Sequence, residues 1–240
     1  MLGRFLEFAV TTPDIRASLD FYRRLGFSQA QVGDTWSHPY AVVTDGRIHI
    51  GLHQDPAAAA ALTFVKPALL SFLDALEPLG VELLVRRLGA DVFNELGWAD
   101  PCGMRVKLIE ARTFSPSKRR PVDVSACGYF SEIGLPCAAP ADGKDFWERL
   151  GFVGMEEPDA PLPHVSCTSD TIDLGLYEPA LLREPTLLFQ TGDVRGALAR
   201  LARDGIEPSG RLPAALRGGP AALLIAPEGT ALLLLGDEAA

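Results

Sequence analysis

The sequence predicts an α+β protein built from four βαβββ modules that pair into two tandem domains with curved mixed sheets. Two repeated landmarks carry this prediction. The segment 20–27, DFYRRLGF, returns as DFWERLGF at 145–152, and GVE at 80–82 returns as GIE at 205–207. Both pairs are 125 residues apart, and one offset shared by two separate landmarks indicates a duplicated unit. The two glycines within each copy lie 54 residues apart, so each half divides again into two modules.

Each landmark glycine ends a predicted helix, because glycine readily takes the left-handed conformation that follows a last helical turn. The first helix begins near Thr12, with Thr12 or Asp14 as its N-cap, and the fourth is capped by Thr191 or Asp193. Apolar residues recur at helical spacing before every one of these glycines. They are Ile15, Leu19, Tyr22 and Leu25 before Gly26; Leu69, Leu73 and Leu76 before Gly80; Phe146, Trp147 and Leu150 before Gly151; and Val194, Leu198 and Leu201 before Gly205.

Strand-like segments fill the stretches between the helices. The clearest is 48–53, IHIGLH, which returns as IDLGLY at 172–177. Apolar residues alternate there with polar residues or glycine, the period of a half-buried strand. We expect the apolar face, with Ile48, Ile50 and Leu52, to pack under helices and the polar face to line a concave surface.

Composition limits the class of protein. A chain of 240 residues with 48% hydrophobic content can form two domains, which we place at 1–113 and 123–240 with a linker at 114–122. The net charge of −9 provides no basic face for nucleic acid, and we interpret the basic cluster at 118–120 as part of a solvated linker. No apolar run approaches the ~20 residues of a membrane span. The four cysteines show no metal-type spacing, which favours reduced thiols and a cytoplasmic protein.

Three features of the sequence carry a family resemblance: the segment SLDFYRRLGF at 18–27, its copy, and the tetrapeptide DPCG at 100–103 before a predicted strand at 104–110. They resemble the vicinal oxygen chelate superfamily, which includes glyoxalase I, bleomycin-resistance and fosfomycin-resistance proteins and extradiol dioxygenases. A weaker counterpart, APEG, stands at 226–229. The resemblance covers nearly the whole chain and implies two tandem glyoxalase-like domains. It says little about activity, because one scaffold of this kind hosts many chemistries.

In metal-dependent members of this superfamily, the resemblance implies ligands from the first and last strands of both modules. A protonated lysine, as at Lys107, repels a divalent cation and has no lone pair to offer. Neither domain supplies more than two plausible ligands, so we expect no metal ion and no other cofactor. The positions concerned are Glu7, His49 or Gly51, a residue near Ala60, and Lys107 in the first domain; and Glu132, Asp173 or Gly175, a residue near Pro185, and Leu233 in the second.

Strand alternation predicts what the first concave face holds. We hypothesise that the Lys107 ammonium pairs with the Glu7 carboxylate where relatives hold a metal; the alternative is that both are surface charges on an open sheet. Glu7 and His49 are also the candidate catalytic groups, although histidines placed like His49 and His53 are more often ordinary polar-face residues than ligands or bases. The aromatic residues before the next strand either roof the pocket or pack on their own loop. The predicted ligand-binding residues are Phe5, Glu7, Trp36, His38, Tyr40, His49, His53, Arg105 and Lys107.

The second domain offers a smaller candidate pocket with Glu132, Asp173 and Tyr177, and Phe130 on the same expected face. Its closing strand, ALLLL at 231–235, is apolar on both faces. A structural half that packs against the first domain is the alternative interpretation.

Three functions follow from these observations. The first is a metal-independent protein that binds a small organic molecule in the first domain, for example for resistance or sequestration. The second is a metal-dependent enzyme, such as a lyase, isomerase or ring-cleaving dioxygenase. The third is an interaction scaffold whose concave faces are filled by their own side chains. We expect a monomer or homodimer with no nucleic-acid or membrane partner.

Overall fold

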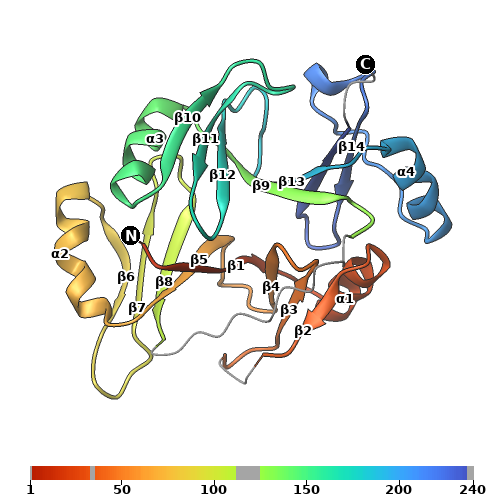
Figure 1. Ribbon diagram of the computed structural model, residues 1–240. Coiled ribbons are helices and arrows are strands. Elements are labelled where there is room, and N and C mark those ends of the chain that lie inside the picture. The colour runs from red at the N-terminus through yellow and green to blue at the C-terminus, as the bar shows by residue number, and fades with distance from the viewer. Residues whose placement is uncertain (1, 33–35, 112–124, 237–240) are drawn as a thin grey trace.

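The computed structural model describes residues 2–32, 36–111 and 125–236, and these form two curved sheets with their helices (Figure 1). The predicted linker and both domain boundaries lie outside the described residues. None of the described helices is long and apolar enough to cross a membrane.

The first sheet has eight strands in the order β2-β3-β4-β1-β5-β8-β7-β6. β1 pairs in parallel with β4 and antiparallel with β5, so it joins the two modules in the middle of the sheet. The elements in chain order are β1 (Arg4–Thr11), α1 (Ile15–Arg24), β2 (Ser28–Ala30), β3 (Tyr40–Thr44), β4 (His49–His53), β5 (Ala61–Lys66), a 3₁₀ turn (Leu69–Phe72), α2 (Leu73–Leu76), a second 3₁₀ turn (Glu77–Leu79), β6 (Leu83–Arg87), β7 (Glu95–Ala99) and β8 (Arg105–Glu110).

The second sheet repeats this order with seven strands, β10-β11-β12-β9-β13-β15-β14. The last module has one strand fewer than predicted among the described residues. Pro208 and Pro213 interrupt the stretch after α4, and proline has no N–H to donate to a strand partner. The elements are β9 (Tyr129–Pro136), α3 (Pro140–Arg149), β10 (Val153–Glu157), β11 (His164–Thr168), β12 (Asp173–Tyr177), β13 (Thr186–Gln190), α4 (Val194–Arg203), a 3₁₀ turn (Ala214–Leu216), β14 (Ala221–Ile225) and β15 (Ala231–Leu235).

The helices begin and end where the sequence indicates. Asp14 caps α1 by accepting hydrogen bonds from two backbone amides, and Asp193 caps α4 in the same way with one. All four landmark glycines have positive φ, from 62° at Gly80 to 99° at Gly151. The second predicted helix is not a regular α-helix, because a 3₁₀ turn lies on each side of its single α-helical turn.

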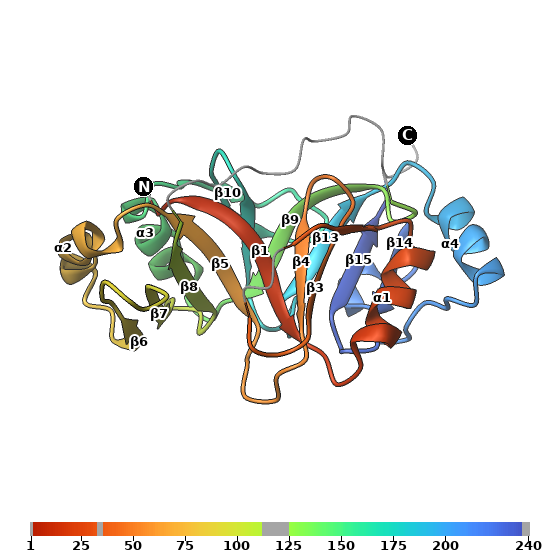
Figure 2. The ribbon, with the colours of Figure 1, turned by 90° about the horizontal axis from the view of Figure 1, so that it is seen from below.

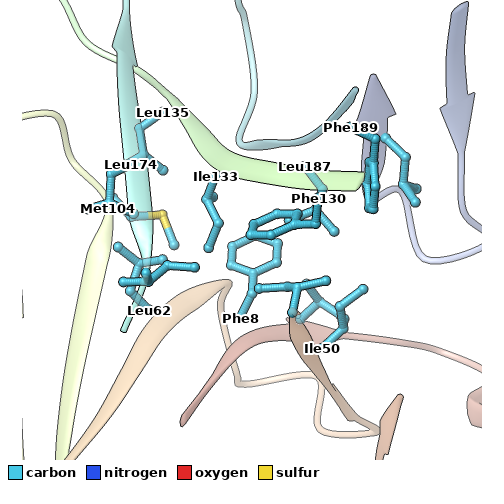
Figure 3. Close-up of a cluster of buried hydrophobic side chains, with 14 of the residues drawn as sticks. Phe8, Ile50, Leu62, Met104, Phe130, Ile133, Leu135, Leu174, Leu187 and Phe189 are labelled. Atoms are coloured by element: carbon cyan, nitrogen blue, oxygen red, sulfur yellow. The ribbon is translucent and has the colours of Figure 1, made fainter. Parts of the chain in front are cut away.

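The two sheets share one hydrophobic core. Side chains from the apolar faces of both sheets meet between them, with Phe8 and Ile50 on one side and Phe130 and Ile133 on the other (Figure 3). All four are at most 6% exposed. Viewed from below, α1 and α4 lie at one end of the molecule and α2 and α3 at the other (Figure 2). The two domains therefore stabilise each other by burying apolar surface, and their other faces are left to form the concave sides.

The duplicated helices also make polar contacts across the domains. In the second domain, Trp147 of α3 donates a hydrogen bond to Asp100, in the turn before β8 of the first domain. Reciprocally, Ser18 and Tyr22 of α1 donate hydrogen bonds to Glu228, in the matching turn before β15. Burial and the charge of Glu228 raise the pKa of the Tyr22 hydroxyl well above its usual range, so it stays a donor. The turns that carried the family resemblance thus connect the two halves.

A disulfide joins Cys102 in the first of these turns to Cys137, the residue after β9, and Cys127 and Cys167 are free and buried. The prediction of reduced thiols is wrong for the bonded pair, because folding brings together two cysteines that are 35 residues apart. Gly143 makes room for the bond, since a Cβ there would lie 3.0 Å from the Cys102 sulfur. The cysteines therefore no longer argue for a cytoplasmic location.

Candidate functional site

The centre of the first concave face is a buried carboxylate. Glu7 on β1 is 1% exposed, although the strand on which it lies is otherwise apolar here. Neighbouring β4 carries Gly51, where a Cβ would lie 2.3 Å from a Glu7 oxygen. The alternation of histidine and glycine in the 48–53 segment therefore has a physical reason: the glycine leaves space for the acid.

Two side chains hold this carboxylate. Tyr40 on β3 and His53 on β4 are register partners, and the Tyr40 hydroxyl donates to Glu7 Oε2. His53 Nε2 lies 3.1 Å from Glu7 Oε1. Burial and the charge of Glu7 raise the pKa of the Tyr40 hydroxyl well above its usual range, which keeps it protonated. Both oxygens of Glu7 are thus engaged within the protein.

The hydrogen bonds continue outward from His53. Its Nδ1 lies 2.9 Å from His38 Nε2, and His38 Nδ1 lies 3.9 Å from Asp55 Oδ2. Trp36 stacks on His38 with 5.7 Å between ring centroids. Side-chain exposure rises along the series, from 2% at Glu7 and 5% at His53 to 19% at His38 and 36% at Asp55. The series therefore links a buried acid to an accessible imidazole.

A cavity of about 430 Å³ lies beside this series. Its charged groups are three cations and two carboxylates. Glu95 pairs with Lys107 at 3.5 Å and with Arg87 at 3.8 Å, which leaves Arg105 and Asp55 as the other charges. Lys107 Nζ also lies 5.2 Å from the ring centroid of Trp36. The lining includes Trp36, His38, His53, Asp55, the alanines 57–59, Val85, Arg87, Glu95, Gly97, Arg105 and Lys107.

The structure brings together seven of the nine predicted ligand-binding residues. Glu7, Trp36, His38, Tyr40 and His53 are linked by the ring contacts and hydrogen bonds described above, and Arg105 and Lys107 line the same cavity. A larger and more open hollow of about 990 Å³ near α1 and β2 also touches Trp36, His38 and Tyr40, but its lining does not include His53, Arg105 or Lys107.

Three expectations need correction. Lys107 pairs with Glu95 and not with Glu7, because Glu95 on β7 lies close enough to the Lys107 ammonium and Glu7 is already occupied. Phe5 does not face the cavity. A register irregularity between Phe5 and Glu7 lets Phe5 pack on the shared core, 5.4 Å from Phe64.

His49 is the third correction. It stands at the far end of β4 from His53, opposite Thr44, and is not among the cavity-lining residues. The alternation of the strand places both histidines on one face, but four residues along a strand span roughly 13 Å. His49 therefore lies on the same face of β4 as His53 but too far along the strand to reach the site.

Sequence reasoning missed Asp55, Arg87 and Glu95, which all line the cavity. Glu95 is 6% exposed and lies in a stretch with no landmark motif. Only sheet pairing brings it to Lys107, so no local pattern could have found it. Asp55 could have been suspected, because it follows His53 by two residues.

The second domain contains the same arrangement with two residue types exchanged. Glu132 corresponds to Glu7, and Gly175 makes room for it as Gly51 does for Glu7. Here the tyrosine is on β12 and the histidine on β11: Tyr177 donates to Glu132, and His164 Nε2 lies 3.6 Å from Glu132 Oε2.

This second arrangement is closed. His164 Nδ1 lies 3.0 Å from the carbonyl oxygen of Leu162, so both ring nitrogens face acceptors. Burial lowers the pKa of His164, but the hydrogen bond and charge of Glu132 outweigh it and the pKa is raised. Leucines line the surrounding concave face, among them Leu162, Leu182, Leu188, Leu216, Leu223, Leu233 and Leu235. A cavity of about 300 Å³ lies among some of them, but its lining includes neither Glu132 nor His164.

The other predicted residues of the second domain lie apart from this arrangement. Asp173 is at the start of β12, where burial raises the pKa of its carboxyl. Phe130 packs in the shared core, because the strand β9 has the same register irregularity as β1.

The positions at which the resemblance implies metal ligands do not fit a divalent ion. Sheet register aligns Glu7 with Thr63 and Thr63 with Lys107 in the first domain. In the second it aligns Glu132 with Leu188 and Leu188 with Leu233. An ammonium, a hydroxyl and two leucines do not provide the His, Asp, Glu or Cys donors that such ions need. In the part of the chain that is described, no group of three such residues could hold a metal.

Residues 4–108 match the family model of the glyoxalase/bleomycin resistance protein/dioxygenase superfamily. Residues 4–108 are therefore similar to a domain of this superfamily, and the predicted resemblance is confirmed. A comparison with curated proteins found no match.

Solved structures extend the likeness to the tandem arrangement. The E323L mutant of homoprotocatechuate 2,3-dioxygenase from Brevibacterium fuscum has a TM-score of 0.65 and 16% identity, over 99% of this chain and 72% of that one. A halotolerant catechol dioxygenase, BphC, has a TM-score of 0.62 and 13% identity, over 97% and 86%. A catechol 2,3-dioxygenase has a TM-score of 0.56 and 13% identity over the same shares. At these identities the likeness shows the fold alone.

Proposed function

We propose that the first domain binds a small organic molecule with an apolar body and an anionic or oxygen-rich group, and that it does so without a metal ion. The observation that carries the proposal is the cavity beside Lys107, where Arg87, Arg105 and Lys107 outnumber the carboxylates of Glu95 and Asp55. Its volume of about 430 Å³ lies within the usual range for small-molecule sites.

The lining suits such a ligand. Trp36 and Val85 offer apolar and aromatic surface, and Arg105 makes no ion pair among the described residues. An anionic group would lie beside the half-buried Lys107, with the more exposed Arg87 and Arg105 nearby, and could accept charge-assisted hydrogen bonds from these cations. An open cavity also argues against a scaffold whose first concave face is filled by its own side chains.

The donor set supports metal independence. Where relatives are expected to hold an ion, this chain has Thr63 and Lys107 beside a carboxylate whose two oxygens are already engaged. The alternative, a metal-dependent lyase, isomerase or dioxygenase, is supported by the shared fold. Cytoplasmic location and the choice between monomer and homodimer stay predictions.

Titration with 8-anilinonaphthalene-1-sulfonate, an aromatic sulfonate, tests the proposal. We expect one saturable site per chain, unchanged by EDTA and weakened about tenfold or more in the Ala59→Trp variant, whose indole would fill the cavity. Ala199→Trp, on the exposed face of α4, is the matched control and should bind normally. Equal binding by both variants, or about one tightly held metal ion per chain in elemental analysis of protein purified without a chelator, would refute the proposal.

A further inference from the structure

The side chains beside the cavity form one hydrogen-bonded series, Tyr40–Glu7–His53–His38, that ends on the imidazole of His38, whose side chain is 19% exposed and lines the cavity. We propose that His38 is a catalytic general base: its Nδ1 removes a proton from carbon in a small acidic organic molecule bound in the first-domain cavity. The inference rests on the proposed function, since the substrate must first occupy that cavity.

The direction of the series follows from Glu7. Tyr40 is a hydroxyl donor, and the carboxylate accepts from it. The second oxygen of Glu7 accepts in turn from His53 Nε2–H, so neutral His53 has its lone pair on Nδ1. That lone pair accepts from His38 Nε2–H. His38 is thereby left with a basic Nδ1, which is the nitrogen on the side of Asp55.

Three surroundings suit this role. Burial and the neighbouring His53 lower the pKa of His38, which keeps the imidazole neutral and able to accept a proton near neutral pH. Asp55, 3.9 Å from Nδ1, can stabilise the imidazolium once it forms. Lys107 lines the same cavity and offers a cation to negative charge that develops on the substrate.

The second domain shows what a purely structural version looks like. There the outer nitrogen of His164 is bound to the Leu162 carbonyl, and the cavity among the nearby leucines is lined by neither His164 nor Glu132. In the first domain the corresponding nitrogen of His53 meets a second histidine, which is 19% exposed and lines an open cavity. Only the first arrangement can pass a proton to or from a ligand.

The step needs no oxidant, reductant or metal ion. The C–H bond of the substrate breaks and its proton goes to His38 Nδ1. The electron pair of that bond forms a new double bond as a leaving group departs from the substrate with its own pair. Glu7 and His53 act through His38 as positioning residues.

The probe is 5-nitrobenzisoxazole, whose C3–H is removed by a base while its N–O bond breaks to give a coloured cyanonitrophenolate. We expect the wild-type protein to exceed the same concentration of free imidazole, with kcat/KM at least about 10²-fold lower in His38→Gln. The rate should rise with deprotonation of His38 and reach half its maximum below pH 6.5, the ordinary value for histidine. The groups that face His38 are His53, Asp55 and Lys107, with Arg87, Glu95 and Arg105 across the cavity.

His49→Gln is the matched control, because His49 lies outside the cavity lining, and it should keep the wild-type rate. Glu7→Gln tests whether Glu7 sets the tautomer of His38, which would not change if Glu7 only supported the fold. The amide can donate to His53 and reverse the series, so ¹H–¹⁵N spectra should show the proton of His38 moving from Nε2 to Nδ1.

A wild-type rate no greater than that of free imidazole, or a His38→Gln rate within about threefold of wild type, overturns the inference. An unchanged His38 tautomer in a folded Glu7→Gln protein overturns the role given to Glu7. If the sulfonate dye still binds while the elimination fails, the proposed function stands and this inference alone is wrong. If the dye does not bind, the proposed function itself fails.

Discussion

Tyr40 lies directly opposite His53 on neighbouring strands, and both bind the same carboxylate, that of Glu7. The second domain repeats this relationship with the tyrosine and histidine exchanged between strands. The buried acid, and the glycine that makes room for it, are the constant parts of the duplicated arrangement.

Gly51→Ala tests that requirement. A Cβ at this position would lie 2.3 Å from the Glu7 carboxylate, so we expect a loss of about 1–3 kcal/mol in the free energy of unfolding. Urea denaturation measures it. Gly192→Ala, where a Cβ meets nothing within 4 Å, should change stability by less than about 0.5 kcal/mol. In a Glu7→Ala background the penalty of Gly51→Ala should largely disappear, and a penalty that persists there would contradict the explanation.

The interdomain disulfide should stabilise the fold. The bond between Cys102 and Cys137 closes a loop with a sequence separation of 35, for which chain entropy gives about 3–4 kcal/mol. We expect a reductant to lower the free energy of unfolding by that order, and to leave a Cys102→Ser/Cys137→Ser variant unaffected. In denaturant without reductant, a thiol assay should find two free thiols per chain. Four thiols would show that the bond is not formed.

The cross-domain contact at Glu228 should couple the two halves. Tyr22 is fully buried, and Glu228→Ala removes the carboxylate to which its hydroxyl donates, so we expect destabilisation of about 1–3 kcal/mol. A double-mutant cycle with Tyr22→Phe should show that most of this loss depends on the pair. Glu207→Ala, at an exposed position, is the control. Strictly additive effects in the cycle would show that the Tyr22 and Glu228 side chains do not stabilise each other.

Stability of the second domain should depend on pH through His164. Because its pKa in the folded state is raised above the ordinary 6.5, its contribution is fully present below about pH 6.5 and is lost as pH rises through the folded value. The destabilisation caused by His164→Gln should therefore be larger at pH 5.5 than at pH 9. In a Glu132→Gln background this difference should shrink, since the partner charge is removed. An equal penalty at both pH values would show that His164 is not held as an imidazolium.

The duplication made most of the fold predictable. The glycines that end the helices, the alternation in the 48–53 segment and the turn at 100–103 are local patterns, and each corresponds to an observed element. The register irregularity beside Glu7 was not predictable, because nothing in residues 4–10 indicates which position breaks the alternation. It moved Phe5, and Phe130 in the copy, from the expected concave face to the core.

By itself the sequence determined a duplicated α+β chain, the position of its buried acid and the absence of a metal-type ligand set from the expected positions, because these depend on residue type and local spacing. Tertiary structure alone decided which side chains meet: Lys107 with Glu95, His53 with His38, and Cys102 with Cys137. These pairs come from different elements, and their separation in space depends on sheet register and on the packing of one domain against the other.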